Sequence, residues 1–373
     1  MGDVAVHPSA PLPVRRRRAY LDNLKVVLVV CVILGHALIT YGDIGSWAYR
    51  ETSTNEAFNV VAGLVVALGS LFAMGVFFLI AGLLTPGPLR RKGSAGFLRD
   101  RALRLGLPFL LFLLVYPTVV WWGERGRAGL GDYLSAQLRL LDPGPLWFVL
   151  VLLVFSAGYV AWRAVRPGRP EPRPLRTTTL VGLGAAIAAA TVLVRLQFPI
   201  DSYQVFALHL WQWPQCLGLF VLGIACAEHG WLDPVPDRLR TGAGLAALTG
   251  FAVIVVAFAL GHTSLDPFAG GLTLPAITTA VCEAVIAVGL SVWLLGRFQR
   301  RHDRTGRLRS AMARAAFGAY VLQAPVLVVI AVALAGLTLT PELKFLVVAP
   351  LGVAASFALS WLLTRVPGVN RIV

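Results

Sequence analysis

The chain has 373 residues, of which 57% are hydrophobic and only 14% are charged. A soluble globular protein carries about 25% charged residues, and a water-soluble core of this size cannot bury so much apolar sequence. The composition therefore excludes an ordinary soluble enzyme, a disordered protein and a fibrous protein. It predicts a polytopic membrane protein.

Ten segments approach or reach the length of about 20 largely apolar residues that a membrane-spanning helix needs. They cover residues 24–41, 60–84, 103–122, 146–165, 178–197, 205–228, 241–261, 272–296, 314–338 and 343–364. We therefore predict an all-α fold, a polytopic transmembrane bundle of about ten helices. The junction of the fifth and sixth segments is the least regular, because Arg195, Gln197, Pro199 and Asp201 crowd it.

The 33 Lys and Arg residues exceed the 18 Asp and Glu residues, giving a net charge of +15. With a cytoplasmic N-terminus, all but six of these cations fall in cytoplasmic segments or at their helix ends. The six exceptions are Arg50, Arg125, Arg127, Arg139, Arg195 and Lys344. The positive-inside rule produces such a bias, so the charge requires no nucleic-acid partner. We predict that both termini are cytoplasmic and that the protein lies in the cell membrane as a multi-pass protein.

Three regions follow from this pattern: a basic cytoplasmic tail over residues 1–19, a ten-helix membrane domain over 20–365 and a short cytoplasmic tail over 366–373. Arg15–Arg18 precede the first apolar segment, as in a signal peptide, but no small-residue cleavage site follows and nine further apolar segments do. We interpret this segment as an uncleaved first helix. A composition rich in Ala, Arg, Gly and Val favours a bacterial source.

Several classes of chemistry lack their usual signatures. The four cysteines lie singly in apolar runs, so we expect neither a disulfide framework nor a zinc or other metal site. The sequence has no phosphate-binding P-loop, dinucleotide fingerprint, HExxH or GxSxG motif. ATP-driven transport, dinucleotide redox chemistry, zinc hydrolysis and serine hydrolysis are therefore not indicated.

The first apolar segment carries Lys25 and, eleven residues later, His36. On a helix this spacing is three turns plus about 20°, so both residues share one face and lie about 16 Å apart. A cation at the cytoplasmic edge and an imidazole deeper in the membrane suit an elongated anionic donor. The alternative is that Lys25 snorkels to the lipid headgroups and His36 makes one interhelical hydrogen bond.

A second group of cations lies in the loop between the second and third apolar segments. Arg101 and Arg104 are i,i+3 neighbours on one helical face, and two adjacent guanidinium groups suit a phosphate-bearing ligand. The positive-inside rule alone accounts for Arg90, Arg91 and Lys92. We therefore select only the Arg101 and Arg104 pair as a candidate binding site.

Glu283 lies near the middle of the eighth segment, where a carboxylate costs about 2.5–3.5 kcal/mol on insertion scales. We expect it to face the bundle interior, protonated or paired, and we favour a site role over a structural hydrogen bond. Trp147 is interpreted as a residue of the aromatic belt. Four other polar residues in apolar runs are predicted to form interhelical hydrogen bonds: His209, Gln212, Gln215 and Gln323.

Six short motifs occur in order along the chain. They are Tyr20–Lys25 followed by His36; Phe77–Leu83; Phe97, Arg101, Arg104, Leu105 and Pro108; Pro145–Phe148; Pro214-Gln215 with Leu219–Gly223 and Trp231-Leu232; and Tyr320–Pro325. Together they resemble acyltransferase family 3, the integral-membrane O-acyltransferases that act on carbohydrates and related acceptors. The sequence departs from the family at three motif positions, with Lys25 for Arg, Ala81 for Ser and Gln323 for His.

The resemblance implies transfer of an acyl group, most simply acetyl, from cytoplasmic acyl-CoA to a hydroxyl of a sugar, glycolipid or glycosylated acceptor. No permanently bound cofactor is implied. His36 would be the general base, or would carry the proton at acyl handover. Lys25, Arg101 and Arg104 would hold the CoA phosphates, and Glu283 would orient His36 or the acceptor.

The competing interpretation is a transporter or flippase of a polar or glycosylated molecule, with His36 and Glu283 on the substrate path. This alternative predicts polar residues on helices in both halves of the chain, which the sequence loosely allows. It does not predict the Arg101 and Arg104 pair or the six motifs. An acyltransferase is therefore the favoured function.

Overall fold

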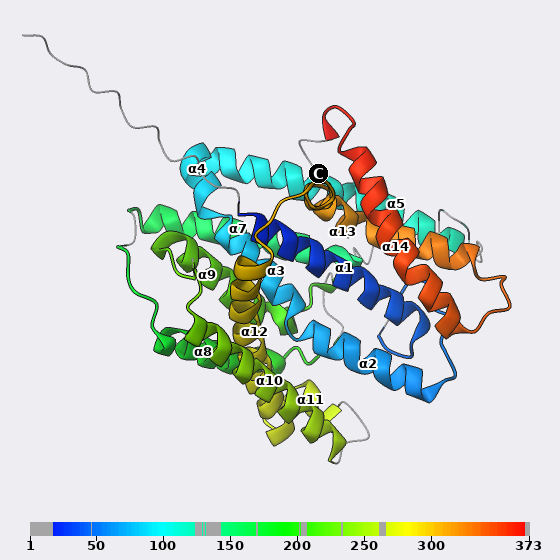
Figure 1. The fold of residues 1–373 in the computed structure, drawn as a ribbon, viewed down its shortest axis with the longest axis horizontal. Coiled ribbons are helices and arrows are strands. Elements are labelled where there is room, and N and C mark those ends of the chain that lie inside the picture. The colour runs from blue at the N-terminus through cyan, green and yellow to red at the C-terminus, as the bar shows by residue number, and fades with distance from the viewer. Residues whose placement is uncertain are drawn as a thin grey trace, which may run out of the picture.

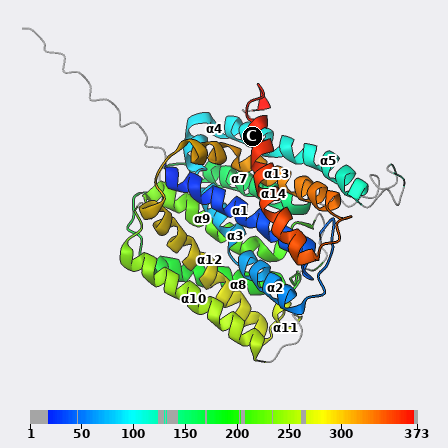
Figure 2. The same ribbon diagram turned by 45° about the vertical axis from the view of Figure 1, so that its right-hand side comes forward.

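The computed structural model describes residues 18–369, apart from 46, 124–128, 130, 132–142, 169–170, 201, 203–206, 233 and 261–265. Arg125, Arg127, Arg139 and Asp201, which entered the sequence predictions, lie outside the described residues. Within the described ranges the chain is helical with connecting segments and no strand. Figure 1 and Figure 2 show these helices packed into one bundle.

Among the described residues, ten helical stretches are long and apolar enough to cross a membrane. They are α1 (Ala19–Tyr41), α2 (Glu56–Ser70) with α3 (Ala73–Leu83), α4 (Pro86–Arg101) continuing through η1 (Ala102–Gly106) into α5 (Leu107–Gly123), η2 (Gly144–Leu146) with α7 (Trp147–Val165), α8 (Thr177–Arg195), η4 (Leu210–Gln212) with α9 (Trp213–His229), α10 (Asp237–Ala259), α12 (Leu274–Arg301), α13 (Arg307–Ala333) and α14 (Pro341–Leu363). A short α11 (Asp266–Ala269) precedes α12. The predicted all-α bundle of ten spanning helices is confirmed. The cytoplasmic position of the termini and the domain boundaries stay predictions.

The basic segment between the second and third apolar segments differs from its prediction as a loop. It forms helix α4, which begins at Pro86 and joins η1 and α5 without an intervening coil. Proline is well suited to the first turn of a helix because its missing N–H would have no partner there. The one break is Gly93, whose φ of 67° is a conformation that glycine adopts readily. The basic side chains of this segment therefore project from a bent helix.

Helix α1 lies at the centre of the bundle, between α13 and α14 on one side and α3 and α12 on the other (Figure 1 and Figure 2). Two hydrophobic clusters meet on it. Leu24 and Leu28 belong to the cluster with α3, α9 and α12, whereas Ile33 and Ala37 belong to the cluster with α7 and α13. All four side chains are buried. The helix that carries Lys25 and His36 is therefore the axis around which both halves of the fold pack.

Two of the family-like motifs pack against each other at glycines. Gly82 on α3 and Gly223 on α9 face one another so closely that neither has room for a side chain. A Cβ atom added at Gly82 would collide with the carbonyl oxygen of Phe220, and one added at Gly223 would collide with that of Leu79. Small residues allow helix backbones to approach in membranes, where packing drives association.

We expect Gly223→Ala to lower the thermal midpoint of the purified protein, because overpacking a tight contact costs about 1–3 kcal/mol. Gly182→Ala on α8 is the matched control, since an added Cβ there meets nothing within 4 Å. Removing a helix glycine at that position should be neutral or stabilise by up to about 1 kcal/mol. Thermal unfolding in detergent measures both. Equal midpoints for the two variants would contradict the close packing of α3 and α9.

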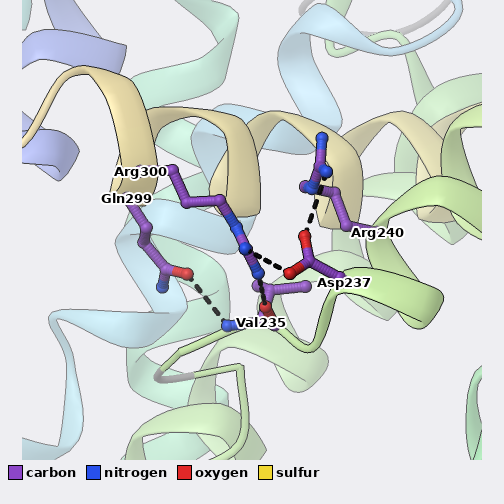
Figure 3. A network of polar contacts seen from close by, with 5 residues as sticks. All are labelled: Val235, Asp237, Arg240, Gln299 and Arg300. Atoms are coloured by element: carbon purple, nitrogen blue, oxygen red, sulfur yellow. Dashed lines mark hydrogen bonds and ion pairs between the residues drawn. The ribbon is translucent and has the colours of Figure 1, made fainter.

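The connection between α9 and α10 is tied to the last turn of α12 (Figure 3). Asp237 forms ion pairs with Arg300 at 2.6 Å and with Arg240 at 3.0 Å. Arg300 also donates to the carbonyl of Val235 at 2.7 Å, and the Val235 N–H donates to Gln299 Oε1 at 2.9 Å. Two of the cations predicted at the cytoplasmic face, Arg240 and Arg300, therefore serve to hold two helix ends together.

Candidate functional site

His36 lies partly buried in the bundle, with its Nδ1 atom buried. Its imidazole stacks on the indole of Trp47, with ring centroids 4.5 Å apart and an interplanar angle of 20°. The side chain of Gln323, on α13, lies beside the same imidazole. His36 Nδ1 is buried and makes no hydrogen bond to any described residue. Three elements far apart in the sequence thus converge on the one histidine that we predicted to be catalytic.

Trp47 is held over His36 by the segment that joins α1 to α2. Lys344, at the start of α14 and only 2% exposed, pairs with Glu51 at 2.5 Å. Ser53 donates a hydrogen bond to Glu342 on the same helix, and the Glu51 N–H donates to the Thr40 carbonyl at 2.9 Å. Sequence analysis missed Trp47, because nothing in its local sequence connects it with α1.

Gln323 is fully buried, and its polar contact among the described residues is with the His36 imidazole. This contact joins α13 to α1 and is the interhelical polar contact that we predicted for Gln323. Tyr320, one turn earlier, fixes this face of α13 by donating a hydrogen bond to the carbonyl of Pro145. Pro325 lies inside the helix and cannot donate to the carbonyl four residues before it.

The motif aromatics of three helices form one cluster next to Gln323. The Phe148 ring on α7 lies 4.6 Å from Phe78 and 5.7 Å from Phe77, both on α3. It lies 6.0 Å from Tyr320 on α13. Three motifs that are distant in the sequence therefore pack together, and the last of them carries Gln323.

Lys25 lies on the same continuous helix as His36, near its first turn. Its ammonium group pairs with Asp22 at 2.8 Å and is partly exposed. Asn23 donates to the carbonyls of His302 at 2.6 Å and Arg304 at 3.0 Å, so the start of α1 is joined to the segment between α12 and α13. We call this end of the bundle, where α1 begins and α12 ends, the basic end.

Arg101 and Arg104 have different direct partners. Arg101 donates to the Thr85 hydroxyl at 3.1 Å and lies over the Phe97 ring at 5.3 Å. Arg104 pairs with Asp100 at 3.3 Å and is exposed. The π-helix η1, which begins at residue 102, has wider turns than the α-helix assumed for the i,i+3 spacing. Their predicted role in phosphate binding is not tested by this geometry.

Glu283 is buried and paired, as expected for a carboxylate inside the membrane. Its Oε2 lies 2.5 Å from Nη2 of Arg195, and both side chains are 2% exposed. The Arg195 guanidinium also lies 5.5 Å from the Trp211 ring. The structure thus gives Glu283 a partner on α8 rather than His36. Arg195 was missed as a site residue, although its charge within an apolar run was the available signal.

Trp147 is not a belt residue, and that prediction was wrong. It is 7% exposed, and its ring lies 5.1 Å from that of His209. A belt residue must reach the lipid headgroups, whereas Trp147 starts a largely buried helix and packs against the segment before α9. Gln215, by contrast, makes a predicted interhelical hydrogen bond, donating to the Leu71 carbonyl at 2.5 Å.

Ten apolar helices around a partly buried histidine define a multi-pass membrane protein with its candidate site inside the bundle. Comparison with protein families matches residues 18–365 to the family described as an acyltransferase domain. The chain belongs to this family, acyltransferase family 3, as its six motifs indicated, and is a membrane acyltransferase. Neither the curated proteins nor the solved structures yielded a match.

Proposed function

We propose that this protein transfers an acyl group, most simply acetyl, from acyl-CoA to a hydroxyl of a carbohydrate or glycolipid acceptor. Acyl-CoA binds at the basic end, which is the cytoplasmic side, and Lys25, Arg101 and Arg104 contact its phosphates. His36 removes the proton of the acceptor hydroxyl as general base. Glu283, paired with Arg195, helps to orient the acceptor.

The observation that carries this proposal is the partly buried imidazole of His36 on the same continuous helix as Lys25. Membership of the family supplies the reaction class. Eleven helical residues separate a cation at the basic end from the imidazole by about 16 Å. The elongated arm of CoA, with phosphates at one end and a thioester at the other, suits such an arrangement.

The test is thiol release from acetyl-CoA by the detergent-purified protein, followed with a thiol-reactive dye. An acyltransferase releases thiol slowly when water replaces the acceptor. It releases thiol faster when an acceptor sugar is added, because the acyl group is then transferred to the sugar. A transporter or flippase releases no thiol. Absence of both acetyl-CoA binding and thiol release in the wild type would overturn the proposal.

We expect Arg101→Ala/Arg104→Ala to weaken acetyl-CoA binding about 10-fold or more, since one charge-assisted hydrogen bond contributes about 1.5–3 kcal/mol. Binding exchanges the present partners, Thr85 and Asp100, for phosphate oxygens. Calorimetry measures the dissociation constant. Arg91→Ala, an exposed cation of the same helix, is the matched control and should leave it unchanged. Equal affinities for the wild type and the double variant would exclude these two arginines from the donor site.

A further inference from the structure

We propose that Gln323 and Trp47 donate the hydrogen bonds that stabilise the oxyanion formed during acyl transfer beside His36. This inference rests on the proposed function and adds to it two residues with a stated chemical task. A tetrahedral intermediate carries a negative oxygen where the thioester carbonyl was. Fixed N–H donors aimed at that oxygen are among the largest contributions to catalysis of acyl transfer.

The first observation is that two buried polar side chains beside the histidine have unused hydrogen-bonding capacity. Trp47 Nε1 has no hydrogen-bond partner among the described residues, and the polar contact described for the Gln323 amide is with His36. A buried polar group without a partner costs about as much as a lost hydrogen bond, so such groups are uncommon. The unused Trp47 N–H and the incompletely bonded Gln323 amide next to one imidazole therefore indicate a place where a polar ligand atom binds.

The second observation is that both donors are held in position from outside the site. Gln323 is 0% exposed, on a helix face fixed by the Tyr320 hydrogen bond to Pro145. Trp47 is held by its stack on His36 and by the segment pinned through Glu51 and Lys344. Since the contact with His36 occupies only one end of the Gln323 amide, the other end remains available to a ligand.

Acyl transfer at this site begins when the acceptor hydroxyl oxygen, or water in its absence, attacks the thioester carbon while its proton passes to His36. The carbonyl π pair moves onto oxygen, which accepts hydrogen bonds from Gln323 and Trp47. When the C=O bond re-forms, the C–S bond breaks, CoA leaves as thiolate and the proton on His36 passes to it. The acyl group is then an ester of the acceptor.

Two conservative substitutions isolate the donors. Trp47→Phe keeps an aromatic ring stacked on His36 and removes only the N–H group. Gln323→Met keeps the side-chain length and removes both polar atoms. In thiol release from acetyl-CoA, we expect each variant to lower kcat by about 100- to 1000-fold. The KM for acetyl-CoA stays close to the wild-type value, because the lost hydrogen bonds form only in the transition state.

Two further measurements separate this role from a structural or positioning one. Gln323→His retains a ring N–H donor and should restore most of the activity lost in Gln323→Met. The shape of the rate–pH profile should stay the same in every variant, since His36 remains the titrating base. A shifted profile would instead make Gln323 a positioning residue for His36 and overturn the inference, as would full activity in Trp47→Phe and Gln323→Met.

The outcome for the wild type keeps the two proposals apart. If the wild type releases thiol and the variants do so equally fast, the oxyanion site is wrong and the acyltransferase function stands. If the wild type neither binds acetyl-CoA nor releases thiol, the proposed function is wrong and the inference falls with it. Thermal unfolding adds a check that does not depend on activity: Gln323→Met should unfold close to the wild type, because an apolar side chain of similar length replaces a buried amide whose hydrogen bonds are incomplete.

Discussion

Replacing His36 with alanine is expected to lower the rate of thiol release from acetyl-CoA by about 100- to 10,000-fold, the usual contribution of a general base. The imidazole lies at the point where α1, α13 and Trp47 meet. Since His36 lies away from the cations of the basic end, acetyl-CoA binding should survive the substitution. Calorimetry and the thiol assay on one preparation measure both quantities.

His229→Ala is the matched control for this experiment. That histidine lies at the last turn of α9, far from α1 in the sequence, and is partly exposed. Its ring stacks on Trp231 at 4.8 Å and its Nδ1 contacts the Glu171 carbonyl. Its removal should leave the rate unchanged. If His36→Ala kept the full rate in a folded, monodisperse protein, the proposed mechanism would be wrong.

The fold could be predicted from the sequence because lipid imposes a simple rule. Every backbone N–H and C=O group within the membrane must be satisfied internally, so each long apolar run has to be a helix. The ten predicted runs match the ten long apolar helical stretches found in the part of the chain that the structure describes. Only the charged segment before the third run was missed, because its polarity indicated a loop whereas Pro86 starts a helix that bends at Gly93.

The site was less predictable, because its members are brought together by packing rather than by spacing. Lys25 and His36 could be related through helical geometry alone, since both lie on α1. Trp47 could not, because its position depends on the ion pair between Glu51 and Lys344 across the bundle. Gln323 was selected only as a possible interhelical hydrogen bond, and its contact with His36 depends on how α13 packs against α1.

Replacing Glu283 with alanine is expected to destabilise the protein by about 3–5 kcal/mol, the cost of leaving one charge of a buried ion pair without its partner. The remaining group, Arg195, is 2% exposed, and its Nε and Nη1 atoms already lack hydrogen-bond partners among the described residues. Removing Glu283 takes away the one ion pair that Arg195 makes among the described residues. The thermal midpoint in detergent should therefore fall well below that of the wild type.

The double variant Arg195→Met/Glu283→Leu decides what this pair does. Well-packed apolar residues in place of a buried ion pair are often neutral or stabilising, so the double variant should recover most of the stability that Glu283→Ala loses. Our prediction that Glu283 orients His36 or the acceptor requires this stable protein to be slow in acyl transfer. Wild-type activity in the double variant would instead assign the pair a purely structural task, joining α8 to α12. A midpoint as low as that of Glu283→Ala would show that the charges themselves, rather than an unpaired Arg195, set the stability of this part of the bundle.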